Sequence, residues 1–99
     1  MLLQIRSTED GFSLEGELDM STAEDLSKVL NENGAAEGPL VLDFSGVSFM
    51  DSSGLRALLE AAQNRSGDGR LVILHPASQV LRVLDISIPG GTPGLEVRP

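Results

Sequence analysis

Two serines next to an aspartate are the residues of this sequence best suited to chemistry. Asp51, Ser52 and Ser53 follow a mostly apolar stretch and precede a segment with helical periodicity, so they fall where a helix begins. Free backbone N–H groups and the positive end of the helix dipole favour negative charge there. A phosphoryl group on one of these hydroxyls would be accommodated without unfolding the helix. On the residues alone, the simpler interpretation, that they only cap the helix, is favoured.

A glycine follows the two serines inside the first turn of the expected helix. Glycine in a helix costs roughly 1 kcal/mol relative to alanine, so Gly54 suggests a compensating role. Without a side chain it would leave the surface beside the hydroxyls flat, where another protein can approach closely. Met50, on the other side of Asp51, is a candidate for contact with the same partner.

A second polar stretch lies at a similar junction, where an alternating segment ends and a helical segment begins. It contains Glu17, Asp19, Ser21 and Thr22. Ser21 and Glu24 have the spacing of a capping box, which predicts that Ser21 is the N-cap of the helix. On the residues alone, a solvated turn followed by a cap explains this stretch.

The periodicity of apolar residues predicts the elements that position both junctions. Strands are expected at 2–7, 12–18, 40–44, 71–74 and 95–97. The first two form a hairpin across Asp10-Gly11, and residues 46–50 form a connecting loop. Helices are expected from Ser21 to near 33–34, from 51–53 to near 66–69, and after 75–78. Phe12, Phe44 and Phe49 are expected in the core.

The element order is therefore β-β-α-β-α-β-α-β, which predicts an α/β fold. Residues 1–99 form a single domain, with a mixed sheet of about four to five strands and helices packed on it. Loops at one end of an open α/β sheet gather into a shared surface. We therefore expect Asp19 to lie near Asp51 and Ser52.

Composition and charge exclude several classes of function. The chain has 99 residues and a net charge of −8, which argues against nucleic acid and against an anionic membrane as partners. It has no cysteine, which excludes thiol catalysis, disulfides and thiolate metal sites. No apolar run is long enough to span a membrane, and the first residues do not resemble a signal peptide. The sequence therefore predicts a cytoplasmic protein.

Enzymatic interpretations find little support in the residues. A serine hydrolase needs a base, and the single histidine, His75, ends a strand before a proline. Asp19, Asp43 and Asp51 would be candidates for a magnesium cluster, but no lysine follows at the expected kind of strand end. No glycine-rich phosphate loop of either common type is present. We expect no catalytic residues, no cofactor and no metal.

Both polar stretches together resemble the signatures of a known family. Asp51-Ser52-Ser53-Gly54-Leu55, preceded by 46–50, resembles the signature of STAS domains, specifically of bacterial anti-sigma factor antagonists. Gly16-Glu17-Leu18-Asp19, followed by Thr22-Ala23, is similar to the family's other hallmark. The resemblance covers roughly residues 12–86. It implies a STAS-like fold.

The resemblance also implies a cytoplasmic protein that switches partners. Ser52 would be phosphorylated by the anti-sigma factor, which is a serine kinase with a Bergerat-type ATP fold. The unphosphorylated antagonist would bind that kinase and free the sigma factor, and a metal-dependent serine phosphatase would reset the switch. The free protein is expected to be a monomer. The residues expected on the partner-binding surface are Glu17, Asp19, Ser21, Thr22, Met50, Asp51, Ser53 and Gly54.

Two other roles within the same family remain open. One is a STAS regulatory subunit of a transporter or lipid-trafficking complex, and the other is a nucleotide-binding STAS module. Subunits of the first kind often lack the serine pair, so Ser52 favours the signalling role.

Overall fold

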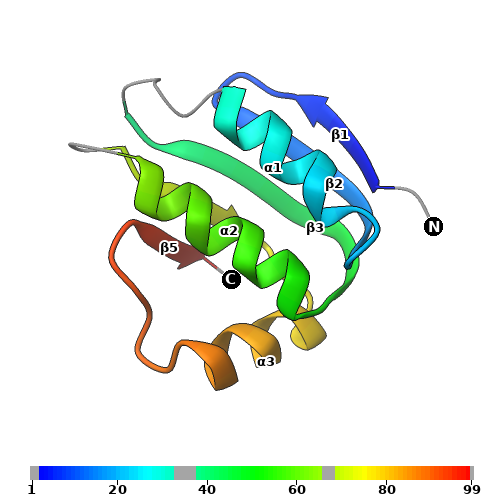
Figure 1. The fold of residues 1–99 in the computed structure, drawn as a ribbon, viewed down its shortest axis with the longest axis vertical. Coiled ribbons are helices and arrows are strands. Elements are labelled where there is room, and N and C mark those ends of the chain that lie inside the picture. The colour runs from blue at the N-terminus through cyan, green and yellow to red at the C-terminus, as the bar shows by residue number, and fades with distance from the viewer. Residues whose placement is uncertain (1–2, 33–37, 66–68, 99) are drawn as a thin grey trace.

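The computed structural model describes residues 3–32, 38–65 and 69–98, and shows one five-stranded sheet with three helices (Figure 1). The predicted order of elements and the α/β class are confirmed. The strands are β1 (Leu3–Ser7), β2 (Gly11–Leu18), β3 (Leu40–Met50), β4 (Leu71–Leu74) and β5 (Leu95–Arg98). The helices are α1 (Ala23–Glu32), α2 (Ser52–Asn64) and α3 (Ser78–Ser87). The turns expected at 33–34 and 66–68 lie outside the described residues.

The sheet has the strand order β1-β2-β3-β4-β5. β1 and β2 form the expected antiparallel hairpin, and every later neighbour is parallel. Each parallel step is made through one helix. α1 and α2 lie side by side against the sheet, and α3 lies below them near the lower ends of α2 and β3 (Figure 1). The carboxyl ends of β2 and β3 therefore open at the same edge as the starts of α1 and α2.

The core lies between the sheet and the helices. Alternate residues of β2, β3 and β4 and the apolar stripes of the helices fill it, because each has one face turned away from water. Phe44, Leu42 and Leu58 are fully buried, whereas Phe12 is only partly buried. The expectation for Phe49 was wrong, since that side chain is 37% exposed.

β3 is longer than the sequence predicts. The loop expected at 46–50 is wrong, because these residues continue to pair with β2, ending with Leu18 opposite Met50. Two register shifts in this ladder change the alternation of side chains. As a result Val47 and Met50 are buried, while Phe49 is turned outward.

Candidate functional site

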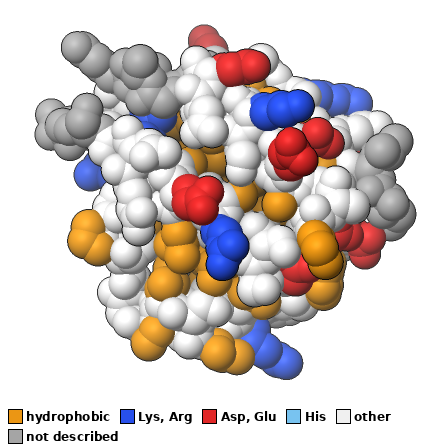
Figure 2. All heavy atoms as spheres, viewed as in Figure 1, with side chains coloured by type: hydrophobic (Ala, Val, Ile, Leu, Met, Phe, Trp, Pro, Cys, Tyr) orange, Lys and Arg blue, Asp and Glu red, His pale blue; other side chains and the backbone are white. Residues whose placement is uncertain are grey.

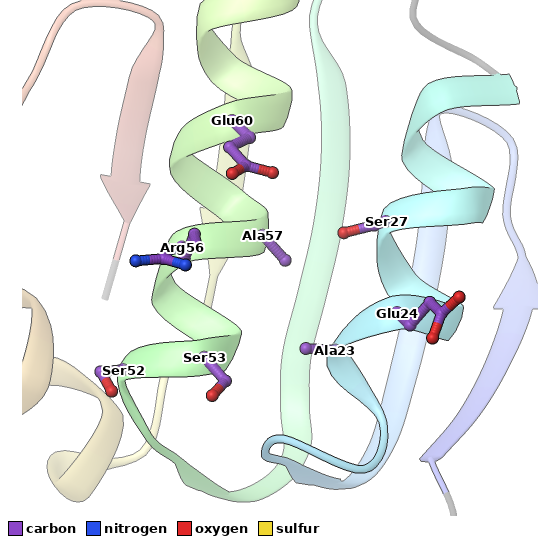
Figure 3. Close-up of a pocket in the computed structure, with 8 residues that line it drawn as sticks. All are labelled: Ala23, Glu24, Ser27, Ser52, Ser53, Arg56, Ala57 and Glu60. Carbon is purple, nitrogen blue, oxygen red and sulfur yellow. The ribbon is translucent and has the colours of Figure 1, made fainter.

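The start of α2 holds the aspartate and the two serines in three different environments. Asp51 is the N-cap, and its carboxylate accepts the backbone N–H groups of Ser53 at 2.9 Å and Gly54 at 3.2 Å. Ser52 is the first residue of the helix and is exposed. Ser53 is half-buried, on the side of α2 that faces α1 (Figure 3). Of the two hydroxyls, the one on Ser52 is therefore the more accessible to another protein.

The loop between β2 and α1 is held by its own polar side chains. The Asp19 carboxylate accepts the Ser21 hydroxyl at 2.7 Å and the Ser21 N–H at 2.9 Å. The Thr22 hydroxyl accepts the Asp19 N–H at 3.0 Å and donates to the Glu17 carbonyl at 2.8 Å. The capping box predicted for Ser21 is wrong, because α1 begins at Ala23 and the Ser21 hydroxyl donates to Asp19.

These hydrogen bonds stabilise the ionised form of Asp19. The bond from the Ser21 hydroxyl is the main cause that lowers the pKa of this carboxyl below its ordinary value of 3.8. Desolvation works in the opposite direction, and the N–H groups of Ser21 and Thr22 add to the lowering. The loop therefore carries a fixed negative charge at neutral pH.

The two junctions are joined directly. The Asp51 N–H donates to the Leu18 carbonyl at 3.1 Å, so the end of β2 supports the start of α2. Gly54 packs on the same residue, since a Cβ added there would lie 2.5 Å from Leu18 Cγ and 2.8 Å from Leu18 O. The structure thus places the loop containing Asp19 beside the start of α2.

The residues expected on the binding surface differ widely in exposure. Ser21 is exposed, and Glu17, Asp19, Asp51 and Ser53 are half-buried, whereas Thr22, Met50 and Gly54 are buried. The direct contact expected for Met50 and the flat surface expected at Gly54 do not fit this burial. Met50 is 0% exposed at the end of a strand, and Gly54 is there to allow helix α2 to approach β2.

Two exposed apolar side chains at this site were missed. Met20 is 80% exposed in the loop after β2, and Phe49 is 37% exposed near the end of β3. Met20 stands between two polar residues of a predicted turn, which was a usable signal. We use the name junction surface for six exposed or half-buried residues near the two junctions, which are Asp19, Met20, Ser21, Phe49, Asp51 and Ser52.

Gln79 of α3 is a further residue that sequence reasoning missed. Its side-chain amide accepts the Met50 N–H at 2.9 Å and donates to the Met50 carbonyl at 3.0 Å. β3 needs this partner because β4 pairs with it only as far as Asp43. Gln79 thereby fixes the backbone one residue before Asp51. Nothing in the sequence pattern around Gln79 predicts this long-range contact.

A hollow of about 440 Å³ lies beside these junctions, between α1 and α2. Figure 3 shows the side chains that line it, which are Ala23, Glu24, Ser27, Ser52, Ser53, Arg56, Ala57 and Glu60. Acidic and basic side chains are interspersed on the helix-covered face, and hydrophobic ones gather toward its α3 side (Figure 2). Six of the eight residues that line the hollow are polar or charged, which suits a protein surface better than a small apolar ligand.

The residues weighed for catalysis have local structural roles. Asp43 accepts the Ser45 N–H at 2.9 Å, and this bond is the main cause that lowers the pKa of Asp43. His75 adopts a positive φ of 53° and is exposed at the end of β4. In the described part of the chain, no three His, Cys, Asp or Glu side chains are placed to hold a metal ion.

Comparison with known proteins identifies the family. The family model described as "Mlab, STAS domain" matches residues 1–87. The chain belongs to the STAS domain family. None of its helices, within the residues described, is long and apolar enough to cross a membrane.

Solved structures share the fold of this STAS domain. An anti-sigma factor antagonist from Mycobacterium paratuberculosis is 23% identical, with a TM-score of 0.79 over 95% of this chain and 83% of that one. The Bacillus cell fate determinant SpoIIAA in its phosphorylated form is 25% identical, with a TM-score of 0.67, and the match covers 96% of this chain and 89% of that one. The anti-sigma factor antagonist SpoIIAA in its unphosphorylated form is 23% identical, with a TM-score of 0.66, and the match covers 94% of this chain and 86% of that one.

Proposed function

We propose that this STAS domain is a cytoplasmic anti-sigma factor antagonist that changes partner when Ser52 is phosphorylated. The unphosphorylated domain binds an anti-sigma factor that is a serine kinase, and so frees the sigma factor. The kinase transfers the γ-phosphoryl group of ATP to the Ser52 oxygen, takes up the hydroxyl proton and releases ADP. A metal-dependent serine phosphatase hydrolyses the phosphoserine and restores the binding form.

The observation that carries this proposal is the exposed Ser52 hydroxyl on the first turn of α2. The N-cap Asp51 already satisfies the N–H groups of Ser53 and Gly54, so a group added to Ser52 does not break the cap. Met20, in the loop after β2, and Phe49, near the end of β3, are exposed apolar side chains that offer contact area to a partner. Further support comes from SpoIIAA, a 25% identical protein with the same fold that has been solved in a phosphorylated form.

Charge explains how phosphorylation would release the partner. The junction surface already carries Asp19 and Asp51, and Glu17 lies just before it. A phosphoryl group adds about −1.5 to −2 charges at pH 7. A partner surface that complements the unmodified site would then meet extra charge and bulk. A penalty of about 3 kcal/mol weakens binding roughly 100-fold, so release needs no change of fold.

Mapping of the phosphorylated residue tests the assignment. The purified domain is incubated with ATP and a candidate anti-sigma factor kinase from the same organism, and the products are analysed by mass spectrometry. We expect one phosphate on Ser52 in the wild type, none in Ser52→Ala, and a normal yield in the matched control Ser87→Ala, which changes an exposed serine at the end of α3. Phosphate found mainly on Ser53 would overturn the residue assignment, and unmodified protein with every candidate kinase would refute the proposal.

A second candidate is a STAS regulatory subunit of a transporter or lipid-trafficking complex. It is favoured by the description of the matching family, which names Mlab and not an antagonist. Affinity capture separates the two roles. Transport proteins that bind Ser52→Ala and Ser52→Asp baits equally would support the second candidate, whereas a kinase bound only by the alanine bait would support the first.

A further inference from the structure

Arg56 lies one helical turn after Ser52 on α2. Residues four apart on a helix have Cβ atoms about 5–6 Å from each other and share one face. Figure 3 shows Ser52 and Arg56 on the side of α2 away from α1, whereas Ser53 and Ala57 lie on the side that faces α1. A group attached to the Ser52 oxygen is thus within reach of the Arg56 guanidinium.

The Arg56 guanidinium has no partner within the described residues. Among the described residues, the ion pairs join Arg70 and Arg98 to Glu96 and do not involve Arg56. No side-chain hydrogen bond of those residues involves Arg56 either. Glu60 follows one turn later, but an arginine placed N-terminal to a glutamate is the weaker orientation for a helical pair. Arg56 is therefore available to an anion on the preceding turn.

We propose that Arg56 binds the phosphate of phosphorylated Ser52. The planar guanidinium can donate two parallel N–H bonds to phosphate oxygens, and such charge-assisted bonds are stronger than neutral ones. The positive end of the α2 dipole acts on the same group. That Ser52 carries a phosphate rests on the proposed function. That Arg56 binds this phosphate goes beyond it. Ser52 and Arg56 both line the hollow beside α1, so Arg56 would hold the phosphate at its edge on α2.

This contact has a measurable effect on the phosphate itself. A bound guanidinium favours the dianion and so lowers the second pKa of the phosphoserine. The carboxylates of Asp51, Glu24 and Glu60 also line or adjoin this region, and they act in the opposite direction. Because those carboxylates are the same in wild type and variant, the difference between the two reports the contribution of Arg56.

The test uses the full chain with phosphoserine installed at position 52 during translation. The phosphate is titrated by ³¹P NMR in the wild type, in Arg56→Gln and in the matched charge control Arg6→Gln on β1. We expect Arg56→Gln to raise the phosphate pKa by about half a unit, as for an exposed ion pair. Arg6→Gln should change the phosphate pKa by much less. The phosphate pKa of Arg56→Lys should lie between those of the wild type and Arg56→Gln. Equal values in wild type and Arg56→Gln would overturn the inference.

The same design separates this inference from the proposed function. Circular dichroism of each variant shows whether the fold is kept, and the installed phosphoserine removes any need for a kinase. The expected shift in a protein that no kinase phosphorylates would refute the proposed function and leave the phosphate-binding role of Arg56 intact. If a kinase phosphorylates Ser52 but Arg56→Gln leaves the phosphate pKa unchanged, the proposed function stands and the role of Arg56 is refuted.

Discussion

Replacing Gly54 with alanine tests how the start of α2 is supported. A Cβ at this position would lie 2.5 Å from Leu18 Cγ and 2.8 Å from the Leu18 carbonyl oxygen. The Leu18 side chain is fully buried, and its carbonyl accepts the Asp51 N–H. Neither atom can therefore move without disturbing the core or the junction between β2 and α2.

Two opposing effects set the size of the change in stability. Alanine is a better helix former than glycine by about 1 kcal/mol. Overpacking a tight core site costs about 1–3 kcal/mol. Because one of the overlapping atoms belongs to the backbone, we place the cost in the upper part of that range. The net loss of unfolding free energy is then about 1–2 kcal/mol, and each 1 kcal/mol lowers Tm by about 4–8 °C in a domain of this size.

Urea and thermal unfolding followed by circular dichroism measure this loss. Gln63→Ala, at an exposed position of the same helix, is the matched control and should change stability by less than about 0.5 kcal/mol. A Gly54→Ala protein as stable as the wild type, or more stable, would show that helix propensity outweighs packing and would refute the reasoning.

Substitutions at three further positions test single interactions. Asp51→Ala should cost about 1 kcal/mol of unfolding free energy through loss of the N-cap, whereas Asp51→Asn should keep most of it. Gln79→Ala leaves the Met50 N–H and carbonyl without partners and should cost about 1–3 kcal/mol, with faster hydrogen exchange at the Met50 amide. Asp19→Asn tests the lowered pKa: the stability due to ionised Asp19 is present above the ordinary carboxyl pKa of 3.8 and is lost as pH falls through the lower folded value. Stability of that variant, measured by urea unfolding, should therefore depend less on pH below about 4.

The elements and their order could be predicted because each has a clear apolar period. The boundaries of β3 could not, since the sequence alone does not reveal the two register shifts in its pairing with β2. Those shifts exchange the expected positions of Phe49 and Met50 relative to the core. A period-two pattern assumes an unbroken ladder, and here that assumption fails next to the candidate site.

The sequence predicted which residues belong to the candidate site, but it did not predict the structural role of each of them. Ser52 and Asp51 could be placed at a helix start from capping preferences alone. Gly54 was noticed for its cost in a helix, but only the three-dimensional approach to Leu18 explains it. The contact between Gln79 and Met50 joins residues 29 positions apart, so no local pattern indicates it.

The affinity of the domain for its anti-sigma factor kinase, with and without phosphate on Ser52, tests the central claim most directly. Isothermal titration calorimetry with the unmodified domain and with the phosphoserine-52 domain gives both dissociation constants under the same conditions. We predict that the phosphate weakens binding roughly 100-fold, which corresponds to about 3 kcal/mol. Equal affinity of the two forms for the kinase would contradict the account.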